Sequence, residues 1–379
     1  MEPDVAGHCL SGGAAAPKEY ASHAKVLSGY RELVRELGGQ PDSLLEDVGI
    51  APPAIEHPSA TVPMRALGRL LEDTAARLGC PDLGLRLAER QSMLAIMQPL
   101  DRLFCTAPTI RDSLLVSVRH MSAFNSGLVM QIDDTPIDGL HLVDFKLLDG
   151  LALFPQLIEQ LVLLTHNSVA WLSAGFAQSR KVWFTHLGIS SPVTYARRFN
   201  AVVEFGQEYD GLFLRDGDLK ARIADCNADL FASEMRRVEQ RFPTRHAEID
   251  LRVRQTIFRI LTQADDCNRQ NIAQHLGFQE RTLNRRLAKR GTSFEAIRDE
   301  VRRDLAFRYL ARADLPLTEI AGRLGYSELA VLSRCCQRWF GTSPRRLRLD
   351  LLSREQRPSR NAAQLMPFTA VRSGQAVML

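Results

Sequence analysis

The 379-residue chain has little cysteine, and its cysteines follow neither of the usual functional patterns. The seven residues are scattered, odd in number and form no Cys-x-x-Cys pair. They indicate neither a disulfide framework nor a zinc site, and they fit a protein of the reducing cytoplasm. Cys335 and Cys336 are adjacent, and we interpret them as small apolar side chains on a helix, with a redox switch as the alternative.

Long hydrophobic runs are also missing. The most apolar stretch, residues 151–164, is interrupted by Pro155, Gln156, Glu159 and Gln160. It is too short and too polar to cross the ~30 Å hydrocarbon core of a bilayer, so we expect a buried helix there and no membrane partner. The chain does not open with a basic run followed by an apolar core, so we expect no signal peptide and a cytoplasmic location.

Signatures of catalysis and metal binding are absent from the sequence. It contains no GxSxG, P-loop, GxGxxG, HExxH or HxxxH pattern. We therefore expect no enzyme activity, no catalytic residues, no cofactor and no metal site. Six isolated side chains are interpreted as core or surface residues: His120, His141, His166, His186, Trp171 and Arg197. The alternative for His166, Trp171 and Arg197 is that they line a pocket.

Positive charge is unevenly distributed along the chain. Residues 269–350 contain 17 Lys and Arg against 9 Asp and Glu, which gives this region a net charge of +8. The residues after 350 carry +3, so the remaining 268 residues must carry −7 to reach the overall +4. A basic region beside an acidic one indicates a polyanionic partner for the basic region only.

The length and the pattern of residues predict two domains. We expect a loose tail at 1–20, an α+β ligand-sensing and dimerisation domain at 21–240, a helical domain at 245–352 and a second loose tail at 353–379. In the first domain, helical spacing predicts helices at 26–37, 64–78 and 109–124. Alternating or β-rich runs predict strands at 128–132, 140–145, 181–186, 202–205 and 212–214. After residue 248 strand patterns end.

An internal repeat lies within the basic region. Asn271–Phe278 (NIAQHLGF) aligns with Glu319–Tyr326 (EIAGRLGY) at an offset of 48 residues. The match resumes after one inserted residue, in the pairs Leu283–Leu332 and Arg285–Arg334.

Each copy has the pattern of a helix-turn-helix unit. Ile and Leu form an inner face, Ala permits close helix approach, and Gly takes the positive-φ turn that other residues adopt only at a cost. We predict units at about 269–290 and 317–340, whose second helices enter the major groove of DNA. A helical repeat that binds protein is the alternative.

The connection between the two units is predicted to be one rigid helix. Thr292–Glu295 has the form of a capping box that opens a helix ending near Arg312. About 19 residues at ~1.5 Å each span ~28 Å, close to the ~34 Å between successive major-groove faces. Ser343 and Pro344 are expected to be the N-cap and first residue of a further helix.

Motifs across the basic region carry a resemblance to a known family. They are Gly277–Leu287, Gly291–Phe294, Val301–Ala306, Ile320–Tyr326 and Phe340–Pro344. With them, residues 250–350 resemble the DNA-binding domain of the AraC/XylS family of regulators. Three segments further upstream resemble the arabinose-binding type of sensor domain found in a subgroup of that family: Pro81–Leu87, Ala107–Ile110 and Phe205–Gly206.

The resemblance implies which positions face DNA bases. In the first unit they are Arg281, Asn284 and Arg285. Arg can bridge guanine O6 and N7, and Asn can pair with adenine N6 and N7. In the second unit they are Leu329, Ala330 and Arg334, of which only Arg334 donates hydrogen bonds, so we expect weaker base readout there.

Other basic side chains are expected to contact phosphates, with a solvated surface role as the alternative. They are Arg286, Lys289, Arg290, Arg338, Arg345 and Arg346. In the second unit, Leu332 and Cys336 replace the phenylalanines common in the family, which indicates looser packing.

Taken together, these features predict a sequence-specific transcription regulator. The resemblance implies a homodimeric, ligand-responsive activator of a metabolic or virulence operon that binds promoter DNA, a small-molecule effector and RNA polymerase. Two alternatives are open. One is an enzyme with a DNA-binding appendage, as in DNA-repair methyltransferases, although their clustered cysteine metal site is missing. The other is a helical protein-interaction scaffold.

Overall fold

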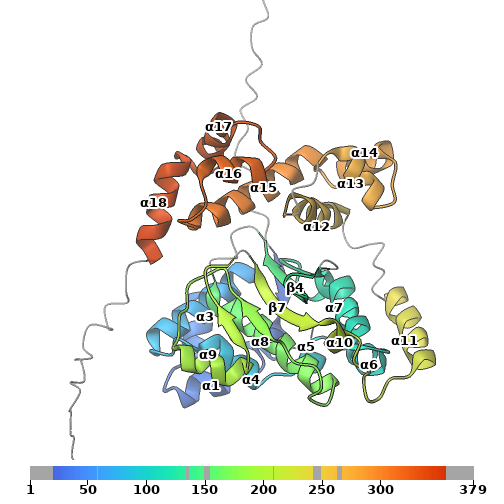
Figure 1. Ribbon diagram of the computed structural model, residues 1–379. Coiled ribbons are helices and arrows are strands. Elements are labelled where there is room, and N and C mark those ends of the chain that lie inside the picture. Colours follow the sequence, from blue (N-terminus) through green and yellow to red (C-terminus); the bar gives the residue numbers. More distant parts are fainter. Residues whose placement is uncertain are drawn as a thin grey trace, which may run out of the picture. The chain divides into compact units, whose positions relative to one another are not determined.

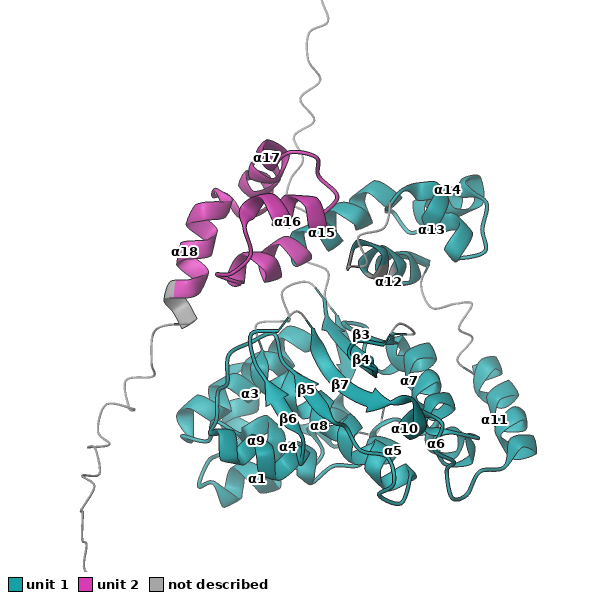
Figure 2. Ribbon diagram, viewed as in Figure 1, with its two compact units in different colours: residues 1–304 teal, residues 305–379 magenta. Residues whose placement is uncertain are grey.

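The computed structural model describes residues 20–57, 59–133, 136–148, 154–207, 209–241, 249–262 and 267–355. Residues 1–304 and 305–379 form two compact units (Figure 2). The two predicted tails therefore lie outside the described residues, except for Tyr20 and residues 353–355.

A five-stranded sheet forms the centre of the sensor region. Its strands are β3 (Leu128–Ile132), β4 (Leu140–Leu147), β5 (Lys181–Trp183), β6 (Val202–Glu204) and β7 (Asp210–Arg215). They lie in the order β3-β4-β7-β5-β6, and every pair is antiparallel except β5 with β6. All five correspond to predicted strands, and sheets together with helices confirm the α+β class of this domain.

Strand β5 is shorter than the prediction of 181–186. The strand ends at Trp183 because the polar groups of Thr185 bind a side chain instead of the backbone of the neighbouring strand. The Thr185 backbone N–H donates to the Asp210 carboxylate at 2.7 Å, and its hydroxyl donates to the same carboxylate at 3.1 Å. A second, two-stranded sheet, β1 (Ala21–His23) with β2 (Thr61–Pro63), had no predicted counterpart.

Helices surround the sheet (Figure 1). They are η1 (Ala24–Leu27), α1 (Tyr30–Glu36), α2 (Pro41–Asp47), η2 (Pro52–Ile55), α3 (Met64–Arg77), α4 (Leu83–Glu89), α5 (Met93–Ile96), α6 (Asp101–Thr106), α7 (Ile110–Phe124), α8 (Pro155–Leu172), α9 (Pro192–Phe199), α10 (Asp216–Leu219) and α11 (Ala228–Arg241). Helix α8 contacts β4 and β7 on one side and α3, α4, α5 and α9 elsewhere. It is buried along most of its length, as expected for a helix that is apolar nearly all round.

Helices α3 and α7 confirm two predicted helices, but the prediction of one helix over 26–37 is wrong. The segment instead forms the short 3₁₀ helix η1 followed by α1. The reason is local: the Ser28 hydroxyl and backbone N–H both donate to the Lys25 carbonyl, at 2.6 and 3.0 Å. Such side-chain bonds to the backbone compete with the continuation of a helix.

The described residues from 249 onward are helical and contain no strand. The helices are α12 (Ile249–Thr262), α13 (Arg269–His275), α14 (Glu280–Ala288), α15 (Phe294–Ala311), α16 (Leu317–Arg323), α17 (Leu329–Phe340) and α18 (Pro344–Glu355). The division between the two compact units falls within α15.

The two turns of the internal repeat have the same geometry. Gly277 and Gly325 both have φ +71°. The residue after each glycine donates its backbone N–H to the alanine five residues before it, Phe278 to Ala273 and Tyr326 to Ala321, both at 2.9 Å. The prediction that glycine ends the first helix of each copy in a left-handed turn is therefore confirmed.

The start of α15 differs from its prediction by one residue. Ser293, not Thr292, is the N-cap: its Oγ accepts the backbone N–H of Ala296 at 3.1 Å. Glu295 makes an ion pair with Arg269 rather than closing a capping box. At α18 the prediction holds, since Ser343 Oγ accepts the Arg346 backbone N–H at 3.3 Å and Pro344 is the first helical residue.

Candidate nucleic-acid interface and sensor site

Helices α13 and α14 pack through the apolar positions of the repeat. Ile272 and Ala273 of α13 are buried, as are Leu283 and Leu287 of α14. Both helices also contact α12, which covers their inner faces. This packing fixes which side of α14 faces outward.

The three predicted base-reading residues of α14 lie on or near its outer side. Arg281 and Arg285 are exposed, and Asn284 is half-buried. Among the described residues, none of the three makes a side-chain hydrogen bond or an ion pair, and α14 therefore presents uncommitted donors. An unpaired guanidinium is suited to a planar acceptor pair such as guanine O6 and N7.

Helix α17 repeats the packing of α14 with a different outer face. Leu332 and Cys336 are completely buried, as are Ile320 and Ala321 of α16. The predicted contact residues of α17 are exposed or half-buried: Leu329, Ala330 and Arg334. Burial raises the pKa of Cys336 to about 11, so its thiol is protonated at neutral pH. The protonated, buried thiol supports the interpretation of Cys336 as apolar filler.

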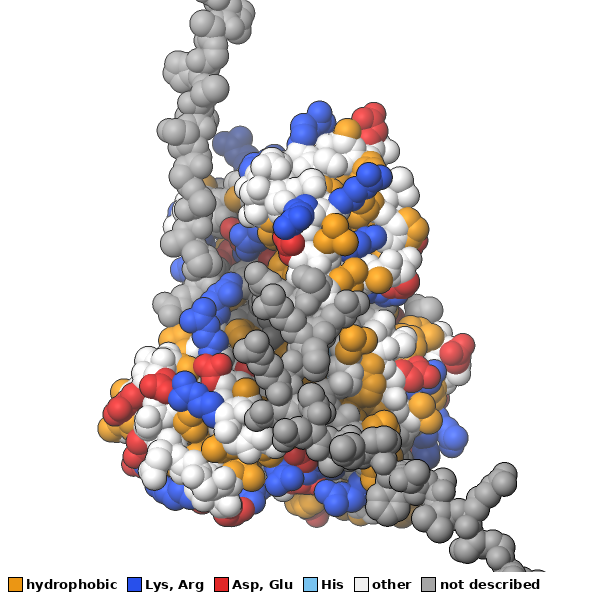
Figure 3. Space-filling model, turned by 90° about the vertical axis from the view of Figure 1, so that its left-hand side faces the viewer, with side chains coloured by type: hydrophobic (Ala, Val, Ile, Leu, Met, Phe, Trp, Pro, Cys, Tyr) orange, Lys and Arg blue, Asp and Glu red, His pale blue; other side chains and the backbone are white. Residues whose placement is uncertain are grey.

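The predicted phosphate-contacting residues fall into two groups, one in each compact unit. In the first unit Arg286 lies over the Phe278 ring, 4.5 Å from its centroid, and Arg290 is 3.8 Å from Asp250. In the second unit Arg346 pairs with Asp350 at 3.2 Å. The other members of the set are exposed: Lys289, Arg338 and Arg345. Lys and Arg side chains are scattered over the face seen in Figure 3.

A buried arginine that sequence reasoning missed supports the first helix pair. Arg254 of α12 is 2% exposed and pairs with Glu300 of α15. Because removal of Glu300 would take this partner from the buried Arg254 charge, the contact holds α12 to the first half of α15. In the sequence, the only indication of this contact is an arginine between the apolar residues Val253 and Ile257.

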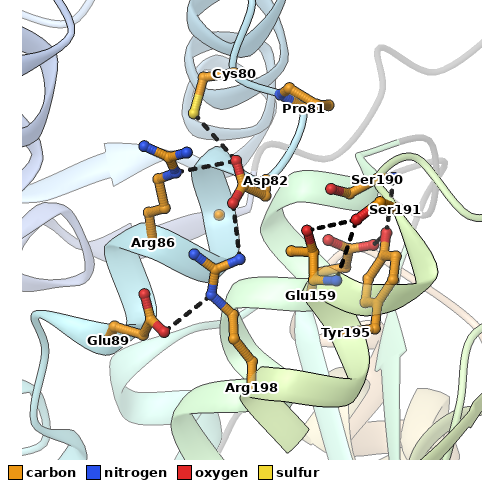
Figure 4. Close-up of polar contacts among 12 residues, drawn as sticks. Cys80, Pro81, Asp82, Arg86, Glu89, Glu159, Ser190, Ser191, Tyr195 and Arg198 are labelled. Atoms are coloured by element: carbon orange, nitrogen blue, oxygen red, sulfur yellow. Dashed lines mark hydrogen bonds and ion pairs between the residues drawn. The ribbon is translucent and has the colours of Figure 1, made fainter. Parts of the chain in front are cut away.

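A second polar network lies in the sensor region, between α4 and α9 (Figure 4). Arg198 of α9 reaches two acids: its Nη1 is 2.7 Å from Asp82 Oδ2, and its Nε is 3.0 Å from Glu89 Oε1. Arg86 donates to the other Asp82 oxygen at 3.0 Å. Although burial opposes it, hydrogen bonds from Arg198 and Arg86 lower the pKa of Asp82.

A buried carboxyl lies close to this network. Glu159 of α8 is fully buried and accepts the Tyr195 hydroxyl at 2.6 Å. Burial raises its pKa to about 8 despite that hydrogen bond. His186 Nε2 lies 3.7 Å from the same carboxyl oxygen, and burial lowers the pKa of His186 to about 4. At neutral pH both groups are therefore predominantly uncharged, which the apolar surroundings require.

The remaining isolated residues lie in core and surface positions. His120 and His166 are buried, and His166 Nδ1 is 3.0 Å from the Ser179 hydroxyl. His141 is half-buried, with Nδ1 3.2 Å from the Asp133 carbonyl. Trp171 is 64% exposed. Arg197 is exposed and lines a hollow between α4 and α9 whose lining includes neither His166 nor Trp171.

The pKa of Glu159 predicts a pH-dependent stability. Its folded-state pKa of about 8 exceeds the ordinary 4.5, so between these values the folded chain binds more protons than the unfolded chain. The stability from neutral Glu159 is full below pH 4.5 and is lost as the pH rises through 8. The Gln side chain of Glu159→Gln cannot ionise. We compare the free energy of unfolding of this variant with that of the unaltered chain at each pH. We expect the difference, variant minus unaltered chain, to be about 1–3 kcal/mol more positive at pH 8.5 than at pH 6.

Urea unfolding at the two pH values measures this difference. The control is Glu46→Gln, which changes an exposed carboxylate on α2 and should show no such pH dependence. An equal effect of Glu159→Gln at pH 6 and pH 8.5 would contradict the raised pKa.

The described residues contain neither a membrane-spanning helix nor a metal-binding cluster. No helix in this part of the chain is long and apolar enough to cross a membrane. Nor do the described residues bring three His, Cys, Asp or Glu side chains together as a metal site.

Known protein families match both the sensor region and the helical region of the chain. Residues 38–223 match the family model of the arabinose-binding domain of AraC transcription regulators, N-terminal, and residues 272–350 match a helix-turn-helix domain model. The chain is 30% identical over 331 residues to the HTH-type transcriptional regulator VirS of Mycobacterium tuberculosis, covering 86% of this chain and 95% of VirS.

Two Pseudomonas aeruginosa proteins are also similar. The ornithine utilization regulator is 23% identical over 316 residues, which cover 83% of this chain and 92% of that protein. The crystal structure of the transcriptional regulator CdpR aligns with a TM-score of 0.40 and 22% identity, covering 83% of this chain and 97% of CdpR. On the two matched domains and the VirS similarity, the chain belongs to the AraC family of transcription regulators.

Proposed function

We propose that this chain is a sequence-specific DNA-binding transcription regulator whose activity a small-molecule effector controls. One observation carries the proposal: α14 presents Arg281, Asn284 and Arg285 on or near the outer side of a helix whose inner side is buried. Exposed donors on a helix of this size suit the major groove, which is ~12 Å wide and displays a distinct pattern for each base pair.

The proposed DNA-binding region contains two helix-turn-helix units. The first is α13 with α14, about residues 269–290, and the second is α16 with α17, about residues 317–340. Helix α15 is the proposed linker. The identical glycine turns and the matched burial of Leu283 and Leu332 support treating the two pairs as equivalent units.

The two units have different proposed roles. In the first, Arg281, Asn284 and Arg285 read base edges. In the second, Arg334 donates hydrogen bonds while Leu329 and Ala330 contact thymine methyl groups, so the second unit discriminates less. Six side chains are proposed to contact phosphates of the DNA backbone: Arg286, Lys289, Arg290, Arg338, Arg345 and Arg346.

The remaining proposals concern the partners. Residues 21–240 form the effector-sensing and dimerisation domain, and residues 245–352 form the DNA-binding domain. The regulator acts as a homodimer and as an activator that contacts RNA polymerase. VirS and the ornithine utilization regulator, both regulators by name, align over most of this chain and support a regulatory role.

Selection from a pool of random duplexes tests the proposal. The full chain is mixed with the pool at about 150 mM salt, and the bound duplexes are sequenced after several rounds, with and without candidate effectors. We expect enrichment of a motif with two boxes, the first more strictly specified than the second. Binding without enrichment under every condition would contradict base readout, and no binding would favour a protein-interaction scaffold.

A further inference from the structure

An arginine-rich hollow opens on the surface of the sensor region between α4 and α9. It has a volume of about 420 Å³ and is lined by Arg86, Glu89, Arg90, Arg197 and Arg198. Four of its five lining residues are arginines, contributed by α4, by Arg90 directly after it, and by α9.

The ion pairs in and around the hollow leave one of its arginines without an acidic partner among the described residues. Arg86 shares Asp82 with Arg198, Arg198 also pairs with Glu89, and Arg90 pairs with Glu36. Three acids thus make ion pairs with three of the arginines. The fourth, Arg197, is exposed and pairs with no acid among the described residues.

One arginine of the hollow is held in place by a buried partner. The Arg198 side chain is only 3% exposed, and its Asp82 partner is 9% exposed, so this pair anchors the floor of the hollow. The Glu89 side chain is 45% exposed, and an incoming anion can replace it at Arg198 without opening the core. Figure 4 shows Arg86 and Glu89 on α4 facing Arg198 on α9.

We propose that this hollow binds the oxyanion group of a small molecule, either a carboxylate or a phosphate. A guanidinium group binds two oxygens of a planar carboxylate or of a tetrahedral phosphate through paired hydrogen bonds. The anion would be held by Arg197 together with Arg86 or Arg198, and it would join α4 to α9. This inference rests on the proposed function, since it identifies the oxyanion as part of the effector.

Hydrogen exchange of the full chain, without DNA, tests the site. The probes are 10 mM sodium phosphate and 10 mM succinate, each compared with sodium chloride at matched ionic strength. A ligand that binds the closed native state slows exchange in the elements it joins. We expect at least one probe to slow amide exchange threefold or more in peptides covering 83–90 and 192–199.

Two variants localise the effect. Arg197→Ala changes an exposed side chain of the hollow and is expected to abolish the slowing, whereas Arg69→Ala changes an exposed arginine on α3 and should keep it. Slowing by phosphate alone or by succinate alone supports the site and identifies the class of anion. The proposal is overturned if neither probe slows these peptides, or if Arg197→Ala responds as the unaltered chain does. Because no DNA is present, this result is separate from the outcome of the duplex selection.

Discussion

Raising the salt concentration from 50 to 200 mM should lower the affinity of the full chain for its selected duplex by two to three orders of magnitude. Each phosphate neutralised by a cation releases counterions and contributes about −0.9 to the slope of log K against log[salt]. Six proposed phosphate-contacting side chains per chain give a slope near −5.

Two of the six proposed phosphate-contacting side chains already have acidic neighbours in the free protein, which affects the expected slope of log K against log[salt]. Arg290 is near Asp250 and Arg346 pairs with Asp350, so they exchange an internal partner for a phosphate. If neither releases counterions, the slope falls to about −4. Fluorescence anisotropy titrations at five salt concentrations measure it.

Two substitutions, one test and one matched control, accompany the salt titration. Lys289→Ala removes an exposed phosphate-contact candidate and should reduce the slope by about one. Leu349→Ala, on an exposed residue of α18, should leave the slope unchanged. A slope shallower than about −1 for the unaltered chain is typical of apolar protein contacts and would favour the interaction scaffold.

The helical region was predictable from sequence because its determinants are local. The glycine turns at Gly277 and Gly325 depend on a steric property of one residue type, and they have the same φ. The buried leucines Leu283 and Leu332 follow from their spacing after those turns. The helix cap at Ser293 was misplaced by one residue because Thr292 has the same capping chemistry.

The sensor site was not predictable in the same way. Asp82 and Arg198 are 116 residues apart in sequence and meet only because α4 and α9 lie side by side in the fold. Glu159 was visible in the sequence as an interruption of an apolar run, but its partner Tyr195 comes from a different helix. Such pairs depend on tertiary packing, which propensity and spacing do not encode.

Three histidines of the sensor region have a pKa well below the ordinary value. His120 and His166 are buried in the sensor core, the His186 side chain is 10% exposed, and burial lowers the pKa of each of the three to about 4. Neutral buried imidazoles of this kind serve packing and hydrogen bonding.

Arg285 carries the most specific part of the account. It occupies the same position in the repeat as Arg334, is exposed on α14 and has no ion pair among the described residues. If it bridges guanine O6 and N7, Arg285→Ala removes a bidentate contact that discriminates one base pair. We expect a loss of about 1–3 kcal/mol on the selected duplex and a relaxed preference at one position.

The measurement is the dissociation constant of the unaltered chain, Arg285→Ala and Lys289→Ala for the selected duplex and for a random duplex, at one salt concentration. Arg285→Ala should weaken binding to the selected duplex about 5- to 150-fold and leave random binding nearly unchanged, whereas Lys289→Ala should weaken both equally. An equal loss on both duplexes for Arg285→Ala would contradict its role in base readout, and with it the claim that α14 reads sequence.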